Sequence, residues 1–223
     1  MARTVTALEA QKRNKERVNV YLDGEFVFGL NMLDAARLSR GQVLSDEEVA
    51  ALRDRDEVAQ AYDRAVSFLS FRPRSTAEIR RNLADKETPD EVIEIVIARL
   101  VEQGYADDVA FARFWVANRM EFKPLSTRAL RYELREKGIA TDTIDEALAE
   151  IDPTEAAYRA AKDKARRLSG STKPDFRKKV GGLLARRGFN YDTARTVIDQ
   201  LIEDLTEEDA RFFLSKDEQD DLE

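Results

Sequence analysis

The sequence predicts an all-α main body of three tandem three-helix repeats, preceded by a small β-hairpin or sheet extension. Three observations predict it. The 223-residue chain has only 5 prolines and 9 glycines, with 43% hydrophobic and 36% charged residues, a composition typical of helical proteins. Apolar side chains recur at helical spacing from about residue 58 to 205. The same pattern then returns after 51 and again after 50 residues.

Strands are expected near the N-terminus. Residues 17–22 and 25–30 flank Asp23-Gly24, a pair that tolerates the positive φ angles of a two-residue hairpin turn. Residues 4–10 could add a third strand, and the sheet should pack on the following helices because a lone hairpin is marginal in water. Pairing across the turn would set apolar residues opposite one another: Val20 with Val27, and Tyr21 with Phe26.

Helix ends are marked by capping signals. A short helix over residues 32–38 should end by Gly41. Capping boxes and N-terminal prolines mark later starts: Ser45 with Glu48, Ser75 with Glu78, Thr88 before Pro89, and Asp152 before Pro153. Gly138 and Gly188 each follow a basic residue, as expected just beyond a helix C-terminus.

The internal repeat carries the fold prediction. Residues 75–83 superimpose on 126–134 and on 176–184, each unit starts with a helix (residues 59–71, 109–120 and 155–168), and each has a basic-proline lead-in. The apolar positions coincide: Ile79, Leu130 and Val180; Leu83, Leu134 and Leu184; Ile93, Ile144 and Ala194; Ile97, Leu148 and Ile198; Leu100, Ile151 and Leu201. Units of about 50 residues rarely fold alone, so neighbours should share cores in an elongated, curved array whose long faces suit extended partners.

These patterns divide the chain into five parts. Residues 1–57 form the hairpin with short helices, residues 58–104, 105–151 and 152–205 are the repeats, and residues 206–223 are an acidic, mostly disordered tail. Within the tail, Phe212-Phe213-Leu214 is interpreted as packing loosely on the last repeat, with a short docking motif as the alternative.

The composition disfavours several function classes. The chain has no cysteine and no histidine, which removes disulfides, thiolate zinc sites and the commonest general base. Asp107-Asp108 precedes a helix and is interpreted as a cap rather than a metal pair. We therefore expect no enzyme, no cofactor and no metal. Without an 18-residue apolar run or a secretory signal, the protein is expected to be cytoplasmic and not membrane-bound.

Charge is unevenly distributed. The net charge is −7, yet residues 159–187 hold eleven Lys/Arg against two Asp, a net +9. Residues 199–223 hold eleven Asp/Glu against two basic residues, a net −9. Such asymmetry indicates either contact with nucleic acid or another charged partner, or a solvated basic helix followed by a solubilising tail.

An ordered set of motifs is similar to one known family. Arg72-Pro73-Arg74-Ser75, then Glu78-Ile79 and Leu83, then Asp107-Asp108 with Phe111-Ala112 resembles the first two repeats of the RecX family. Residues 131–139 (RYELREKGI) and 184–189 (LARRGF) resemble the second- and third-repeat signatures. The resemblance covers roughly residues 58–205. The chain departs from the family at Lys86-Glu87 and Lys123-Pro124-Leu125, and residues 1–56 exceed what the family's core requires.

The resemblance implies a function without an active site. RecX-like proteins lie in the helical groove of the RecA–single-stranded-DNA filament and limit its ATP hydrolysis, strand exchange and co-protease activity, and they also bind DNA directly. The chain is thus expected to be a monomeric regulator of RecA in recombination, DNA repair and the SOS response, with single- and double-stranded DNA as further partners. Two alternatives stay open: a DNA- or RNA-binding helical protein without RecA specificity, and a protein adaptor that uses the acidic tail.

The candidate contact residues are basic. Residues at inter-helix corners, on the middle helices or in the basic segment could bind phosphate or acidic protein surface, although single members more simply cap or solvate helices. The candidates are Arg72, Arg74, Arg80, Lys123, Arg128, Arg131, Arg135, Lys162, Arg166, Arg167, Lys173, Arg177, Lys178, Lys179, Arg186 and Arg187. Lys164 extends the same region, and Arg177-Lys178-Lys179 favours binding because no Glu lies within four residues. Aromatic residues are expected in the core rather than stacked on bases: Phe111, Phe114 and Trp115, and Tyr21, Phe26 and Phe28.

Overall fold

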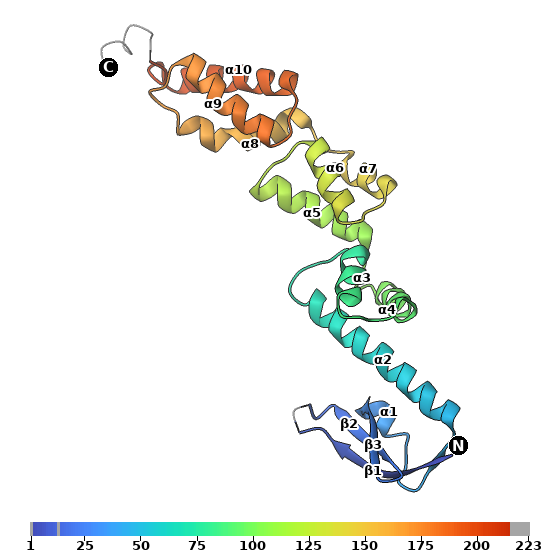
Figure 1. Ribbon diagram of the computed structural model, residues 1–223. Helices are drawn as coiled ribbons and strands as arrows, with labels where there is room; N and C mark the ends of the chain where they lie inside the picture. The colour runs from blue at the N-terminus through green and yellow to red at the C-terminus, as the bar shows by residue number, and fades with distance from the viewer. Residues whose placement is uncertain (1, 13, 215–223) are drawn as a thin grey trace. The chain divides into compact units, whose positions relative to one another are not determined.

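The computed structural model describes residues 2–12 and 14–214 (Figure 1). It consists of two compact units, Met1–Ala106 (unit 1) and Asp107–Glu223 (unit 2). The mostly helical body and the small N-terminal sheet confirm the predicted fold class.

Unit 1 begins with an antiparallel four-stranded sheet in the order β3-β2-β1-β4. Its strands are β1 (Arg3–Ala10), β2 (Arg17–Leu22), β3 (Glu25–Asn31) and β4 (Val43–Leu44). The hairpin turn at Asp23-Gly24 has the expected positive φ angles, 52° and 88°. Tyr21 pairs with Phe26 as predicted, but the pairing of Val20 with Val27 is wrong, since an irregularity shifts the register and brings Val20 opposite Phe28.

A long helix follows the sheet. Helix α1 covers only Met32–Ala35 of the expected 32–38. Helix α2 (Asp46–Leu69) then runs unbroken from the Ser45 capping box, so the separate helix expected over residues 59–71 is wrong. The reason is that no glycine or proline interrupts this stretch. Asp56 on α2 is buried and accepts hydrogen bonds from Arg17 (2.7 Å) and Gln60 (2.6 Å), which joins β2 to α2.

The first repeat is completed by α3 (Thr76–Ala84) and α4 (Asp90–Glu102). Its capping box at Ser75 is formed as predicted. The Thr88 cap is wrong: Pro89 occupies the N-cap position, and buried Thr88 accepts a hydrogen bond from Arg64 instead. The apolar stripes of α3 and α4 meet α2 in one core.

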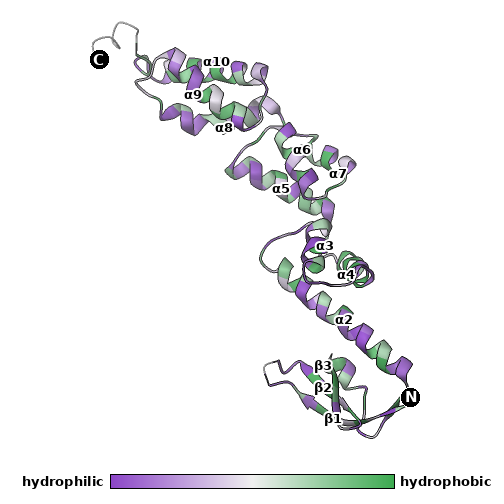
Figure 2. Cartoon of the chain, in the orientation of Figure 1, coloured by the Kyte–Doolittle hydropathy of each residue, from purple (hydrophilic) through white to green (hydrophobic). Residues whose placement is uncertain are grey.

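Unit 2 holds the other two repeats. Its helices are α5 (Asp108–Phe122), α6 (Thr127–Glu136), α7 (Thr141–Leu148), α8 (Pro153–Arg166), α9 (Lys173–Arg186) and α10 (Tyr191–Glu208). Hydrophobic and hydrophilic residues alternate along each of them (Figure 2). Each repeat has a core of its own, and the partly buried Met120 and Ile151 pack against both. The expected sharing of cores is therefore small among the described residues of this unit, because each three-helix repeat closes mainly around its own apolar stripes.

The third repeat departs from the other two where α9 begins. Thr172 is the N-cap, and Lys173-Pro174 form the first turn of the helix. The basic-proline motif therefore lies inside a helix in the third repeat, whereas in the first two it precedes the caps at Ser75 and Ser126. The equivalence that the sequence predicts for these corners is wrong at Lys173.

Residues 207–214 are ordered, contrary to expectation. Helix α10 continues to Glu208, Phe212 is buried, and Phe213 meets Phe176 edge-on at 5.1 Å between ring centroids. The predicted packing of this aromatic pair on the last repeat is confirmed. Burial of apolar rings outweighs the local acidic composition. The rest of the predicted disordered tail, residues 215–223, lies outside the described residues.

A close backbone approach joins the two repeats of unit 2. Gly188, which follows α9, has φ +85°, and a Cβ atom placed on it would lie 2.7 Å from Ser126 Oγ and 3.0 Å from Ala129 Cβ. The amide of Ser126 donates to the carbonyl oxygen of Arg187 (3.1 Å). The Arg187 guanidinium donates in turn to the carbonyl oxygen of Pro124 (3.2 Å). The predicted glycine beyond the helix end thus also allows α9 to meet the start of α6.

Replacing Gly188 by alanine should destabilise the protein by about 2–4 kcal/mol, because a strained φ adds to a contact too short for a Cβ. Gly170 is the matched control, since its φ is +76° but no atom lies within 4 Å of its Cβ position. Gly170→Ala should cost about 1 kcal/mol, from backbone strain alone. Urea unfolding followed by circular dichroism measures the free energy of unfolding of both variants. Equal losses of stability would show that the close approach at Gly188 does not contribute to the cost of the substitution.

Candidate nucleic-acid interface

Five of the sixteen candidate cations already have carboxylate partners. Arg72–Glu78 is part-buried, whereas the other four pairs are more exposed and contribute little stability. Each pair nevertheless occupies a guanidinium. The pairs are Arg72–Glu78 (2.9 Å), Arg80–Glu94 (2.8 Å), Arg131–Asp145, Arg166–Glu208 (3.4 Å) and Arg177–Asp199. No Glu lies within four residues of Arg177 in the sequence, but in the fold Asp199 approaches it from α10 rather than from its own helix.

Three further candidates lie over aromatic rings. The Arg74 guanidinium carbon is 3.9 Å from the centre of the Phe68 ring, and burial lowers the pKa of this guanidinium, with the positive charge of Arg72 as a smaller cause. Lys162 and Lys173 lie 5.8 Å from the rings of Tyr158 and Phe213. The corner residues Arg72, Arg74 and Lys173 thus have unlike surroundings and do not repeat a common contact.

Five candidates are exposed and have no ion pair or ring contact among the described residues. Arg128 and Arg135 lie on α6, Lys178 and Lys179 lie on α9, and Lys123 directly follows α5.

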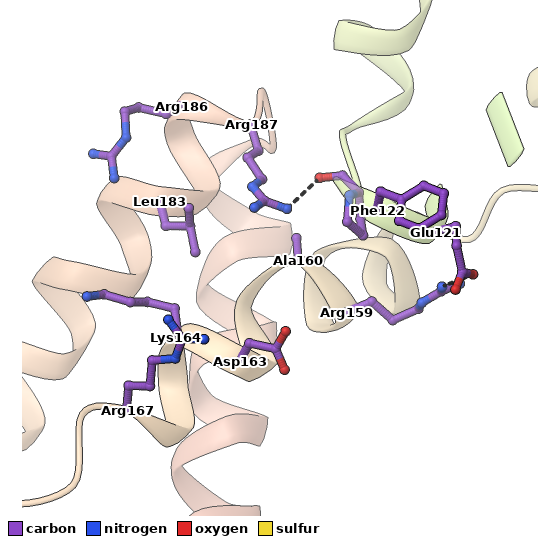
Figure 3. Close-up of a pocket in the computed structure, with 11 residues that line it drawn as sticks. Glu121, Phe122, Arg159, Ala160, Asp163, Lys164, Arg167, Leu183, Arg186 and Arg187 are labelled. Atoms are coloured by element: carbon purple, nitrogen blue, oxygen red, sulfur yellow. Dashed lines mark hydrogen bonds and ion pairs between the residues drawn. The ribbon is translucent and has the colours of Figure 1, made fainter. Parts of the chain in front are cut away.

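The remaining three, Arg167, Arg186 and Arg187, meet in one cleft of unit 2. The cleft has a volume of about 380 Å³ and lies between the end of α5 and the helices α8 and α9 (Figure 3). Five cations and two carboxylates line it, a net charge of +3. The lining residues are Glu121, Phe122, Pro124, Arg159, Ala160, Asp163, Lys164, Arg167, Leu183, Arg186 and Arg187.

Helix periodicity places the cleft's cations. Lys164 and Arg167 are three residues apart and share a face of α8, and Arg186 ends α9. Figure 3 shows these three side chains on one side of the cleft and Phe122 on the other. Arg159 is paired with Glu121 (3.6 Å), which leaves Lys164, Arg167 and Arg186 without a carboxylate partner among the described residues.

Arg187 forms part of the cleft wall and is half-buried. Desolvation lowers the pKa of its guanidinium, although an arginine stays charged at neutral pH. Because its Nη1 donates to the Pro124 carbonyl oxygen, Arg187 holds the two walls of the cleft together.

The acidic segment neutralises a different part of the basic segment. Helix α10 packs against α8 and α9, where Asp199 and Glu208 pair with Arg177 and Arg166. Tyr158 on α8 donates a hydrogen bond to Asp204 (2.7 Å). The two opposite charge blocks of the sequence therefore partly fold onto each other. Of the basic segment's cations without a carboxylate partner among the described residues, Lys164, Arg167, Arg186 and Arg187 line the cleft, while Lys178 and Lys179 are exposed outside it.

The sequence candidates missed Arg159 and Phe122. The spacing of charged residues could have indicated Arg159. Arg159, Asp163 and Arg167 follow one another at intervals of four residues, which places them on one helix face. For Phe122, the signal was its position exactly 51 residues after Phe71 in the repeat.

The aromatic predictions were partly wrong. Phe111 and Phe28 are buried as expected, and half-buried Trp115 donates from Nε1 to Glu133 (2.8 Å). Phe114 and Phe26 are 42% and 57% exposed, because they point away from the apolar stripe of α5 and from the covered face of the sheet.

Asp107 accepts hydrogen bonds from the amides of Val109 and Ala110, which confirms it as the α5 cap. Among the described residues, no group of three or more acidic side chains is arranged to hold a metal. Within the same residues, no helix has the length and apolar character needed to cross a membrane.

Comparison with known families matches most of the chain. Four family models match: the regulatory protein RecX N-terminal domain at residues 3–45, and the first, second and third three-helix domains of RecX at residues 61–100, 107–148 and 150–198. The N-terminal extension is therefore part of this domain set, and the expectation that it exceeds the family's requirements is wrong.

Similar proteins bear the same name. The chain is 34% identical over 202 residues to "Regulatory protein RecX" of Bacillus subtilis, covering 88% of this chain and 76% of that protein. It is 36% identical over 220 residues to the Levilactobacillus brevis protein of that name, covering 94% and 80%. A crystal structure of regulatory protein RecX superimposes with a TM-score of 0.67 at 30% identity, covering 88% of this chain and 99% of the other.

The Tyr158–Asp204 contact predicts a dependence of stability on pH. Its hydrogen bond to Asp204, followed by burial, raises the pKa of Tyr158 above its ordinary value, which is about 10. The neutral phenol is thus favoured in the folded state, and the contribution is complete below pH 10 and declines as the pH rises through the raised pKa. Urea unfolding at pH 8 and pH 11 should show a smaller loss of stability in Tyr158→Phe than in the wild type. Equal losses in both proteins would contradict this assignment.

Proposed function

The chain belongs to the RecX family of regulatory proteins, and on that premise we propose that it binds in the groove of the RecA–single-stranded-DNA filament and inhibits RecA's ATPase, strand-exchange and co-protease activities. The observation that carries the proposal is the cationic cleft of unit 2, in a chain with four RecX domain matches. The cleft supplies a contact for phosphate or for acidic protein surface.

The charge distribution supports this use of the cleft. The chain as a whole carries −7, so attraction to a polyanion must come from a local surface. Lys164, Arg167 and Arg186 provide three cations from two helices, at a place where α10 supplies no counter-charge. Cations from two neighbouring helices at one side of a hollow can contact successive phosphates of one strand.

The mechanism needs no chemistry by the chain itself. A protein with several domains in tandem can contact successive RecA protomers and so oppose the rearrangements that accompany ATP hydrolysis. Exposed Lys123, Arg128, Arg135, Lys178 and Lys179 could add contacts, whereas the paired arginines would first have to lose their carboxylate partners.

The same cleft also favours a second function, binding of nucleic acid without RecA. The two functions differ in one measurement. Inhibition of RecA's DNA-dependent ATPase at substoichiometric amounts of this protein supports the first, while DNA binding that leaves the ATPase unchanged supports the second.

Charge reversal in the cleft should abolish the activity. Lys164→Glu, Arg167→Glu and Arg186→Glu together should reduce binding to an oligothymidylate by more than tenfold and remove ATPase inhibition, since three attractive contacts become repulsive. The comparison variant is Arg128→Glu, Lys178→Glu and Lys179→Glu, which changes the net charge equally on exposed residues outside the cleft. It should weaken binding less than the cleft variant and keep ATPase inhibition, because these residues would only add contacts to those of the cleft. Circular dichroism checks that both variants fold. If the comparison variant loses inhibition and the cleft variant keeps it, the interface lies on α6 and α9 and the cleft assignment is wrong.

Salt dependence gives an independent test. In the wild type, the logarithm of the binding constant should fall linearly with the logarithm of salt concentration as counterions are released. Replacing Arg186 alone by Gln should reduce that slope by about 1 if the side chain contacts a phosphate. Fluorescence anisotropy between 50 and 200 mM salt, about the range over which such effects are large, measures it. An unchanged slope would remove Arg186 from the interface.

A further inference from the structure

An exposed aromatic side chain stands at the edge of the cationic cleft. Phe122 is the last residue of α5, and its side chain is 78% exposed although it helps to line the cleft. It therefore contributes little to either core of unit 2, and neither core includes it. Isolated exposed apolar residues are common on soluble proteins, so exposure alone assigns no role to Phe122.

The repeat gives this position more significance. Phe71 lies 51 residues earlier, is 81% exposed, and is followed by Arg72-Pro73 as Phe122 is followed by Lys123-Pro124. Two repeats thus carry an exposed phenylalanine before a basic residue at the end of the first helix. The third repeat has Thr172 at this position, where it caps α9.

The chemistry of the cleft identifies a ligand. Lys164, Arg167 and Arg186 lie across the hollow from Phe122 (Figure 3). Cations along a groove follow a phosphate backbone, and an aromatic face beside them stacks on a base whatever its identity. In a duplex the bases are already stacked on each other, so only a single strand offers a free base face to such a side chain.

We propose that Phe122 is a stacking platform for one base of a single-stranded nucleic acid whose backbone phosphates bind Lys164, Arg167 and Arg186. This deepens the proposed function and rests on it, because the same cations are assigned to phosphate there. It adds a preference for single strands over duplex that charge alone does not give.

The experiment separates base stacking from charge. Phe122→Ala is compared with the wild type on three probes of equal length: an oligothymidylate, an abasic deoxyribose-phosphate strand with the same phosphates but no bases, and a duplex. Tyr191→Ala is the matched control, because Tyr191 is 77% exposed in the same unit but does not line the cleft. Phe122→Trp keeps an aromatic face at the position. Anisotropy of the labelled probe gives each affinity.

Phe122→Ala should weaken oligothymidylate binding about tenfold, the size expected for one stacked base, and leave the abasic strand and the duplex within about twofold of wild type, since their phosphate contacts remain. Phe122→Trp and Tyr191→Ala should bind the oligothymidylate as the wild type does. An unchanged oligothymidylate affinity in Phe122→Ala, or an equal loss on all three probes, would overturn the proposal.

The same measurements distinguish failure of the proposed phosphate binding from failure of the stacking role alone. If the wild type binds none of the probes, or if charge reversal of the cleft changes no affinity, the cleft does not bind phosphate and both proposals fall. If charge reversal removes binding while Phe122→Ala behaves as wild type, only the stacking role is wrong.

Discussion

The candidate interface depends on one close backbone approach, between Gly188 and the start of α6. The missing Cβ of Gly188 lets its chain come within van der Waals distance of Ser126 and Ala129. The Ser126 amide then reaches the Arg187 carbonyl oxygen, and the Arg187 side chain reaches Pro124. Each repeat has its own core, and among the described partly buried side chains Met120 and Ile151 alone pack against both cores. These few polar contacts therefore carry much of the alignment between α5 and α9. The same contact brings Phe122 and Arg186 to opposite sides of one cleft, so packing and binding geometry have a common origin.

The acidic and the basic segment of the sequence neutralise each other in one part of unit 2 but not in another. The carboxylates of α10 reach Arg166 and Arg177 because α10 packs on α8 and α9, and Tyr158 adds a hydrogen bond to Asp204. Surface pairs of this kind contribute little to stability, but they cancel positive potential where they form. The α10 carboxylates in these pairs do not contact the cations that line the cleft. The positive potential of the cleft therefore depends on where α10 packs as well as on the number of basic residues.

Much of the fold could be predicted from the sequence, because it is encoded locally. Capping boxes at Ser45 and Ser75, the hairpin turn at Asp23-Gly24 and the threefold apolar pattern each depend on residues near one another in the chain. Other features could not be predicted, because they depend on contacts between segments that are distant in the sequence. The pairing of Arg177 with Asp199, the burial of Phe212 and the bulge that brings Val20 opposite Phe28 all depend on segments meeting in three dimensions. For the site, Arg167, Arg186 and Arg187 were among the candidates, but nothing in their spacing distinguished them from cations that became paired.

An acidic protein can still bind a polyanion, because electrostatic potential in salt is local. At physiological ionic strength charges are screened over about 8 Å, so the net −7 of the chain is felt weakly by a phosphate inside the cleft. That phosphate experiences chiefly Lys164, Arg167 and Arg186, together with the nearby Asp163. The acidic remainder then has a selective effect, since it opposes non-specific association elsewhere along a DNA strand. A single contact of this size binds weakly, and an exposed aromatic face beside it adds affinity that salt does not screen. In the proposed arrangement, charge would direct a strand to the cleft, while stacking would distinguish a single strand from a duplex.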